Sequence, residues 1–463
     1  MINNIFRNII NISDYVTILC LICFYYLVPK GADFWVILPC LLIFYFLFFK
    51  SLQKPIQIGN IKSFIKIDVL FYAFSYLLYY LPYQKYILSF SVLETPWFFN
   101  DYIEYSNPSI ILSTIALLIF DLGYRTYKNN NNKRKHTSTV PDLFYINFVI
   151  GTILLLIIAL MSYYFLQNGL KSLYKYAVTD VEIVAKSGYR EIQYFVMLLS
   201  GMLVYCWKYC RKFNLVIVSS IIVSFFWTIY LLLLGDRNSF FLVGIIFVAG
   251  YFTLFKSILR KNIFLLFIGA LFLYFTVEIV RGSESRDLAT YISAYNSISE
   301  IEGVSFDITT VGYRATLDIV PNKHDYFYGK FLLVSFSNCI PFLTGILISN
   351  SDMLWGSGQT ITYYLLGPKA SWGLGSNIIS DLYMDFGLLG VLLFMFLLGR
   401  FAIWVQCKFE KNPQSLKWVV IYFMTLALFA ELPRYGLGFI VRSLVWTFLF
   451  FGVLKLFRKK LYA

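Results

Sequence analysis

Residues 143–166 read LFYINFVIGTILLLIIALMSYYFL and contain no charged side chain. As a helix this run is roughly 36 Å long at ~1.5 Å per residue, which exceeds the ~30 Å hydrocarbon core of a bilayer. A basic, asparagine-rich segment, KNNNNKRK at 128–135, comes shortly before it. Basic residues beside a long apolar run are typical of the cytosolic end of a transmembrane helix. This stretch therefore predicts a helix that crosses a membrane and starts in the cytosol.

The rest of the chain repeats this pattern. Its 463 residues are 59% hydrophobic and 20% aromatic, and the mean hydropathy is +0.69. We predict an all-α polytopic integral membrane protein with twelve transmembrane helices. The predicted spans are 15–29, 33–49, 65–81, 109–124, 143–166, 192–207, 214–234, 238–255, 263–280, 377–399, 418–432 and 437–454. The first predicted span has no small-residue site for signal-peptide cleavage, so we expect it to remain as a transmembrane helix.

The distribution of charge between the loops predicts the orientation. We place both termini in the cytosol, together with the loops 50–66, 125–142, 208–213, 256–262 and 400–417. That side then holds 24 of the 39 Lys and Arg residues but only five of the 25 Asp and Glu residues. This excess is the positive-inside pattern. The net charge of +14 therefore reflects topology, and we expect no nucleic-acid partner.

The cysteines and histidines predict neither a disulfide framework nor a metal site. Only Cys339 lies on the predicted outer side, whereas Cys20 and Cys23 lie inside an apolar span as small hydrophobic residues. The two histidines, His136 and His324, fall on opposite sides of the membrane, which excludes a histidine-rich zinc site. We therefore expect no metal and no cofactor.

Loop length divides the chain into three parts. Residues 1–280 hold the first nine predicted spans, 281–376 form one long outer loop, and 377–463 hold the last three spans. Long loops in otherwise compact proteins are usually functional. Within this loop we expect an interfacial helix over 281–302. The apolar segment 331–349 is either re-entrant or surface-lying, because a full span there would reverse the charge rule for the rest of the chain.

Arginines on the outer side are the strongest indication of function. Topology explains basic residues in the cytosol, but not those at the opposite face. The outer arginines that we single out are Arg190, Arg237, Arg281, Arg286, Arg314, Arg434 and Arg442. Guanidinium groups bind phosphate oxygens in a bidentate fork and stay charged. The pattern predicts a large anionic ligand at the outer face, such as a lipid-linked diphosphate.

Two groups of these residues lie where predicted spans end. Arg237 belongs to the turn Gly235–Asp236–Arg237–Asn238, at the depth of the lipid headgroups. A salt bridge with Asp236 or headgroup anchoring is the alternative explanation. Glu278 and Arg281 are three residues apart and can share a helix face, and Arg286 follows. The alternative there is an ion pair that closes the helix end.

The long loop contributes a third group. Arg314 offers a cation, while His324 and Asp325 offer groups that accept a proton from a sugar hydroxyl. A solvated loop surface is the alternative for all three residues.

The last two spans contribute a fourth group. Arg442 interrupts an apolar run, where a charge costs ~2.5–3.5 kcal/mol at the centre of a span. It must therefore face a wet cavity, a phosphate or an acid, for which Glu431 and Glu278 are the candidates. We add Arg434 in the turn before this span, Arg190 before the sixth, and Asp381 at the start of the tenth as substrate-binding candidates.

The two segments YFYGKFLLVSFSNCIPFL at 326–343 and GLGSNIISDLYMDFGLLGVLLFMFLLG at 373–399 resemble the Wzy-type O-antigen polymerases. The residues that carry the resemblance are Gly329, Pro341, Gly375, Ser376, Asp381, Tyr383, Phe386, Gly387 and Gly390. The Gly235–Asp236–Arg237 turn is similar to an arginine turn of that family. Arg190, with ten residues before Gly201, resembles its Arg-x10-Gly pattern.

The resemblance implies a metal-independent glycosyltransferase of GT-C-like architecture in a bacterial inner membrane, with its active site facing the periplasm. Its substrates would be undecaprenyl-diphosphate-linked repeat units, and its partners membrane lipids and a Wzz-type chain-length co-polymerase. Arg237, Arg281, Arg314 and Arg442 would bind the diphosphates. The proton acceptor is either a carboxylate or His324, and the residues do not decide between them.

Three other functions fit parts of the pattern. A flippase for lipid-linked glycans also has about twelve spans, but the long loop 281–376 argues against it. An O-antigen ligase performs a similar transfer and differs only in its acceptor. A secondary transporter would show repeat symmetry and interrupted spans, and the sequence has neither.

Overall fold

The computed structural model describes most of the chain. The described residues are 2–90, 92–93, 100–127, 143–168, 189–210, 214–233, 236–269, 272, 305–340, 343, 354, 356–370, 373–375 and 377–461, without the side chains of 2–12, 168, 189, 233, 237, 305–306 and 457–461. Nearly all of these residues form helices. A single short hairpin pairs β1 with β2, in the register Gln57 opposite Lys62.

The elements follow one another in a simple order. The first half comprises α1 (Ile2–Leu27), α2 (Phe34–Ser51), β1 (Ile56–Ile58), β2 (Ile61–Ser63), α3 (Ile67–Tyr79), α4 (Leu81–Ile87), η1 (Ile103–Tyr105), α5 (Ser106–Arg125), α6 (Leu143–Asn168), α8 (Tyr189–Tyr209), α9 (Leu215–Leu233) and α10 (Arg237–Leu254). The second half comprises α13 (Ser305–Asp318), η4 (Ile319–Lys323), α14 (Lys330–Ser337), α16 (Ser357–Leu366), α17 (Ile378–Lys411), α18 (Leu416–Glu431), η5 (Leu432–Arg434) and α19 (Leu437–Leu461).

These helices agree with the predicted spans. Seven described helices are long and apolar enough to cross a membrane, which is consistent with a polytopic membrane protein. They correspond to α2, α5 with η1, α6, α9, α17, α18 with η5, and α19. Shorter apolar helices occupy the predicted spans 15–29, 65–81 and 238–255. A helix also covers 192–207, and residues 260–269 are helical where the span 263–280 begins.

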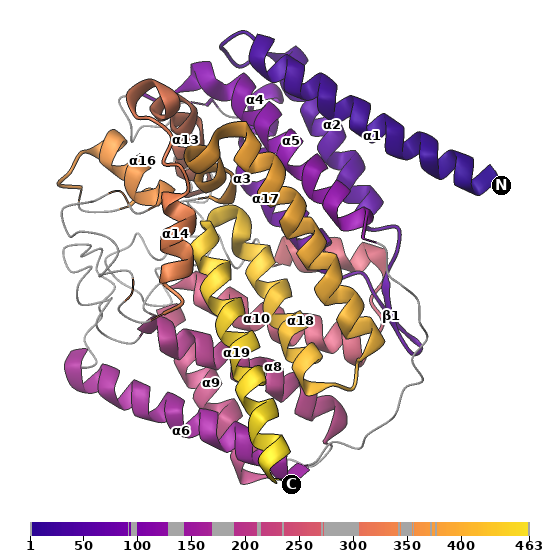
Figure 1. Cartoon of the computed structure of the whole chain (residues 1–463), viewed down its shortest axis with the longest axis vertical. Coiled ribbons are helices and arrows are strands. Elements are labelled where there is room, and N and C mark those ends of the chain that lie inside the picture. Colours follow the sequence, from indigo (N-terminus) through magenta and orange to yellow (C-terminus); the bar gives the residue numbers. More distant parts are fainter. Residues whose placement is uncertain are drawn as a thin grey trace.

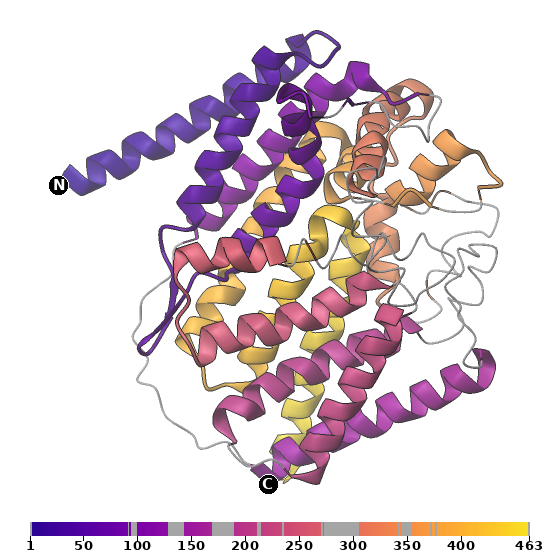
Figure 2. The same cartoon turned by 180° about the vertical axis from the view of Figure 1, so that it is seen from behind.

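Loops predicted on the same side of the membrane contact one another. The backbone N–H of Lys62 donates to Ser257 Oγ (3.0 Å), and Arg260 Nη2 donates to the Gln53 carbonyl (3.0 Å). The Tyr209 hydroxyl donates to the Pro413 carbonyl (2.7 Å). The hairpin and the loop after α10 thus lie side by side at one end of the molecule (Figure 2). Loops that the charge pattern assigns to the same side of the membrane therefore lie close together in the structure.

The opposite end carries the helices of the predicted outer loop. Figure 1 shows α13, α14 and α16 grouped together, away from the β1 hairpin. The loop between α1 and α2 joins this end, since the backbone N–H of Gly31 donates to the Glu104 carbonyl (2.8 Å). Asn107 Nδ2 donates to the Pro29 carbonyl (3.1 Å). Segments far apart in sequence therefore meet here. We call this group, formed by residues 28–33, η1, α13, η4, α14 and α16, the outer cap after its predicted side of the membrane.

The long helix α17 packs closely against α5. A Cβ atom added to Gly399 would lie 2.1 Å from the Phe120 carbonyl oxygen, and one added to Gly123 would lie 2.2 Å from the Phe396 carbonyl oxygen. Glycines allow helix backbones to approach one another closely in membranes. This contact fixes the position of α17, whose first turns build the outer cap described next.

Candidate functional site

The N-terminal turns of α8 and α10 meet η5 and α19 in what we call the arginine junction. Arg434 Nη1 donates to Asn238 Oδ1 (3.1 Å), and Gln193 Nε2 donates to the Ser239 carbonyl (3.2 Å). These contacts join η5 to the first turn of α10, and α10 to the first turn of α8.

Arg442 on α19 pairs with a carboxylate in the first turn of α8. Its guanidinium forms an ion pair with Glu191 and lies over the Trp446 ring, 4.6 Å from the centroid. Both partners are half-buried. Helix packing brings Glu191 to the arginine, a partner that the sequence did not suggest. Of the two acids expected from sequence, Glu431 and Glu278, the second lies outside the described residues.

Four arginines, Arg190, Arg237, Arg434 and Arg442, lie on the segments of the arginine junction, together with the carboxylates of Glu191 and Asp236. The exposed Arg190 is the second residue of α8 and makes no ion pair within the described residues. Arg237 is the first residue of α10, although its side chain lies outside the described residues. Asp236 caps the same helix, with its carboxylate accepting from the backbone N–H of Ser239 (3.2 Å). The N-terminal ends of two helices add partial positive charge, so the junction can attract an anion.

Two anchors hold Arg434 in place. The carbonyl of the neighbouring Pro433 accepts a hydrogen bond from the buried Tyr79 hydroxyl (2.8 Å). On the other side, the backbone N–H of Leu437 donates to Asp381 Oδ2 (2.8 Å). These two contacts hold the backbone on either side of the half-buried Arg434, whose guanidinium contacts Asn238.

Asp381 and Asp385, one turn apart on α17, form what we call the carboxylate hub. Asp381 Oδ1 also accepts from the backbone N–H of Ser357, the first residue of α16 (3.1 Å). Asp385 accepts from the backbone N–H groups of Phe331 (3.0 Å) and Leu332 (2.9 Å), in the first turn of α14. Carboxylates at helix N-termini satisfy unpaired N–H groups and the helix dipole. The two side chains thus dock α14, α16 and α19 onto α17.

Only Asp381 was among the sequence-based site residues, as a substrate-binding candidate. Its carboxylate is buried and accepts from two helix N-termini, so the geometry gives it a positioning role beside the arginine junction. The role of Asp385 was not predicted. Its spacing of one turn from Asp381 in an apolar helix was the available signal, because two buried carboxylates on one helix face require partners.

The glycines of the sequence motif have local structural roles. Gly387 adopts φ +63° inside α17, and a Cβ there would lie 3.1 Å from the Tyr326 ring. Gly329 adopts φ +90° before α14, and a Cβ there would lie 2.8 Å from Phe386. The backbone N–H of Phe327 donates to the Met384 carbonyl (2.9 Å). The motif therefore packs the segment before α14 against the bend in α17.

Arg314 on α13 is fully buried, with 1% of its surface exposed. Its guanidinium donates to the Leu93 carbonyl (3.1 Å) and to Ser106 Oγ (3.4 Å). Burial lowers the pKa of Arg314, but an arginine stays charged in proteins. The side chain holds α13 to the segment before α5, and the catalytic role predicted for it remains untested.

His324 and Asp325 follow η4 at the surface of the outer cap. The Nδ1–H of His324 donates to the Asp325 carbonyl (2.5 Å), and the ring stacks on Phe327 at 4.3 Å between centroids. This tautomer leaves the lone pair on Nε2, which can accept a proton. Asp325 is exposed. Neither residue contacts the arginine junction through a hydrogen bond in the described part of the chain.

Asp318, at the end of α13, takes part in an ion pair and a hydrogen bond. It pairs with Lys323 (2.6 Å) and accepts from the Tyr105 hydroxyl (2.9 Å). The hydrogen bond to Asp318 raises the pKa of Lys323.

Three predicted site residues, Glu278, Arg281 and Arg286, and the interfacial helix expected over 281–302 lie outside the described residues.

The fold defines a polytopic membrane protein, and the arginine junction is its candidate anion site. The chain belongs to the O-antigen polysaccharide polymerase Wzy family, whose model matches residues 9–463. The resemblance noted in the sequence is thereby confirmed over nearly the whole chain. Membership implies a glycosyltransferase-like polymerase that acts on lipid-linked glycans in a bacterial membrane. No curated protein and no solved structure matches the chain.

Proposed function

We propose that this protein joins undecaprenyl-diphosphate-linked oligosaccharide repeat units into an O-antigen-type polysaccharide. The growing glycan leaves its carrier and is transferred to the non-reducing end of an incoming lipid-linked repeat. The observation that carries the proposal is the contact of Arg434 with Asn238 (3.1 Å), which brings η5 and the arginine turn at the start of α10 together. Family membership supplies the reaction class.

The arginine junction binds the diphosphate of the donor. An acceptor hydroxyl attacks the anomeric carbon of the donor sugar, and a new carbon–oxygen bond forms as the bond to the diphosphate breaks. Undecaprenyl diphosphate leaves with the bonding electrons, so negative charge develops where the guanidinium groups lie. Preorganised positive charge at that position lowers the barrier. The hydroxyl proton passes to a base, for which His324 Nε2 and the Asp325 carboxylate are the candidates, and no metal takes part.

The reaction takes place at the periplasmic face of the bacterial inner membrane, with both termini in the cytosol. The scaffold is of the GT-C-like type with twelve spans. As the sequence predicts, Arg237 and Arg281 bind the diphosphates, and Arg286 and Glu278 contribute to substrate binding. A Wzz-type co-polymerase sets the chain length. Support for this orientation comes from the excess of basic residues in the loops assigned to the cytosol.

The test is a gel of surface lipopolysaccharide from cells that lack the gene and are complemented with variants. Without the gene, we expect the ladder to collapse to core plus a single repeat. Wild type and Arg260→Ala restore the ladder, because Arg260 lies at the opposite end of the molecule. Arg434→Ala at a normal protein level does not restore it.

Two other results would contradict the proposal. Bare core without any repeat indicates that flipping or ligation is the missing step, and the flippase or ligase function then replaces polymerisation. A full ladder with Arg434→Ala removes the arginine junction from the diphosphate site.

A further inference from the structure

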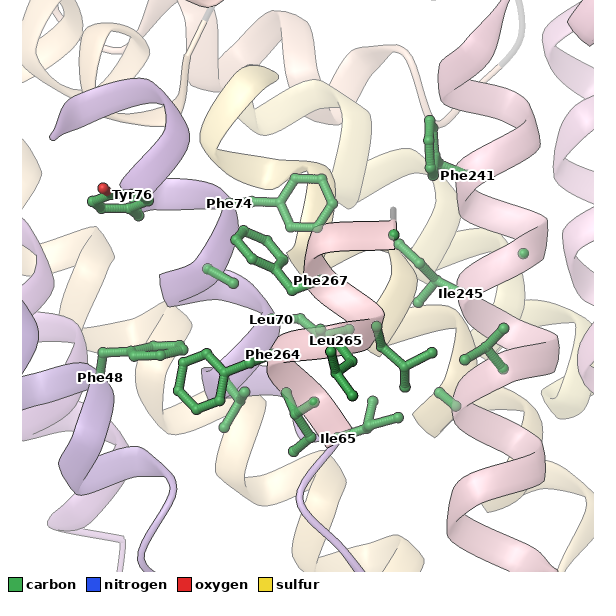
Figure 3. Close-up of a pocket in the computed structure, with 18 of the residues that line it drawn as sticks. Phe48, Ile65, Leu70, Phe74, Tyr76, Phe241, Ile245, Phe264, Leu265 and Phe267 are labelled. Carbon is green, nitrogen blue, oxygen red and sulfur yellow. The ribbon is translucent and has the colours of Figure 1, made fainter. Parts of the chain in front are cut away.

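An apolar cavity of about 660 Å³ lies between α2, α3, α10 and the helical residues 260–269. Figure 3 shows Phe48 on α2, Phe74 and Tyr76 on α3, and Phe264 and Phe267 converging on this space. The α10 side is formed by residues that include Phe240, Phe241, Gly244, Ile245, Val248 and Ala249. Such a volume exceeds the voids normally left in packed protein interiors.

The wall of the cavity offers no free polar group among its described residues. Tyr45 and Tyr76 carry the hydroxyl groups of the wall, and both donate to Gln84 Oε1 (2.5 Å each). Two lining residues, Val248 (42% exposed) and Leu265 (68% exposed), reach the side of the helix bundle. The cavity is therefore open toward the surroundings of the bundle, which in a membrane are lipid chains. Such a cavity suits an apolar occupant, because water needs polar partners.

Two glycines create part of the space. A Cβ atom added to Gly244 or to Gly269 would meet no heavy atom within 4 Å. Gly244 lies on α10 and Gly269 ends the described part of the opposing helix, and both line the cavity. Glycine is less favourable in a helix than alanine, so these two positions sacrifice helix stability while leaving the cavity open.

The cavity continues directly from the arginine junction. Asn238, which accepts the hydrogen bond of Arg434, is followed within one turn by the lining residues Phe240 and Phe241. The lining then continues along α10 as far as Ala249, a rise of roughly 16 Å from Asn238 at ~1.5 Å per residue. A cationic end with an apolar space below it is complementary to an amphiphile that has an anionic head and one long hydrocarbon chain.

We propose that this cavity binds the polyprenyl chain of the lipid-linked diphosphate substrate while the arginine junction binds the head. The inference rests on the proposed function and adds the place of the lipid chain. The head must be strongly anionic to match the arginine junction, and the chain must enter from the side of the bundle. Burial of each additional CH₂ group contributes about 0.8 kcal/mol, so a long chain adds substantially to the affinity.

The test uses the purified full-length protein in nanodiscs. Gly244→Leu fills the cavity, and Gly452→Leu is the matched control, because a Cβ at Gly452 on α19 also meets nothing within 4 Å but lies outside the cavity. Gly269→Leu serves as a second filling variant in case Gly244→Leu does not fold. Polymerisation is measured with an undecaprenyl-diphosphate-linked repeat and with a geranyl-diphosphate-linked repeat. Direct binding of undecaprenol, which has no phosphate, is measured separately.

We expect Gly244→Leu to raise KM for the undecaprenyl substrate by about tenfold, the effect of losing roughly two buried CH₂ groups. KM for the geranyl substrate and kcat for both should not change. Undecaprenol binding should weaken in Gly244→Leu and persist in Gly452→Leu and Arg434→Ala. Equal KM changes for the two substrates, or none, would overturn the proposal. Displacement of undecaprenol by an equal amount of phosphatidylglycerol would do the same, since it indicates a general lipid groove.

Failure of the proposed function gives a different result. If wild type polymerises neither substrate, the polymerase function is wrong, and undecaprenol binding alone decides the inference. Loss of that binding in the filling variants but not in Gly452→Leu then supports the lipid site, and equal binding in all variants overturns it.

Discussion

Arg314 and Arg434 were both predicted from sequence as outer arginines of the site, yet their surroundings in the structure are opposite. Arg314 is 1% exposed and donates to a backbone carbonyl and a hydroxyl. Arg434 is half-buried at a junction with the first turn of α10. The first guanidinium joins parts of the outer cap, whereas the second lies where an external anion can reach it. Accessibility therefore separates an arginine that holds the fold together from one that is a candidate for binding.

Arg314→Ala should have the largest effect, and the effect should be on stability. The substitution leaves the buried Leu93 carbonyl and Ser106 hydroxyl without their donor and opens a cavity. We expect a loss of about 3 kcal/mol or more in the free energy of unfolding. Thermal unfolding in detergent, followed by fluorescence-detected size-exclusion chromatography, measures it. An unchanged melting temperature together with lost polymerisation would place Arg314 in the active site and remove the contrast with Arg434.

Arg434→Ala should leave the folded protein intact and lower polymerisation. Loss of one preorganised donor to developing negative charge typically costs about a hundredfold in rate. The measurement is kcat with a lipid-linked repeat in nanodiscs, alongside the melting temperature. Arg434→Lys should recover only part of the rate, because an ammonium group cannot form the bidentate contact. A lower melting temperature with unchanged kcat would make Arg434 a structural residue like Arg314.

Asp381→Asn tests whether the carboxylate hub positions the arginine junction. Asparagine keeps one acceptor oxygen but loses the charge that favours the N-termini of α16 and α19. We expect a moderate loss of about tenfold in polymerisation, with a decrease of about 1 kcal/mol in stability. Asp385→Asn is the matched variant, since Asp385 holds α14 but not α19. An equal loss in both variants would contradict a specific link between Asp381 and Arg434.

Lys323→Ala should have the smallest effect. Its ion pair with Asp318 lies at the surface, with 44% of the lysine side chain exposed. Exposed pairs contribute less than about 1 kcal/mol, and the lysine lies outside the arginine junction. Both the melting temperature and kcat should stay near wild type. A large loss of activity would show that the outer cap around η4 takes part in catalysis, as predicted from sequence for His324 and Asp325.

Much of the fold was accessible from the sequence, because apolar runs of span length have few alternatives to a helix in a membrane. The predicted ranges 109–124 and 418–432 became α5 and α18, almost wholly buried in the bundle. The boundaries were less accurate. The predicted 377–399 became Ile378–Lys411, since hydropathy marks where lipid ends and not where the helix ends.

The site was accessible only in part. The sequence identified Arg190, Arg434 and Arg442 as outer residues, and the structure brings the elements that carry them together. The sequence did not reveal the Glu191 partner of Arg442, because that pair joins residues 251 positions apart. Nor did it reveal the burial of Arg314, whose hydrogen-bond partners lie 208 and 221 positions earlier in the chain.

By itself, then, the sequence determined the class of protein and the family, and it predicted the alternation of the loops. These follow from local properties: the length of apolar runs, the sign of charge in each loop and the spacing of glycines around Gly387. The tertiary structure alone decided which arginine is buried, which carboxylate docks which helix, and where a cavity remains between α3 and α10. Those outcomes depend on helix packing, in which one position contacts residues that no local pattern specifies.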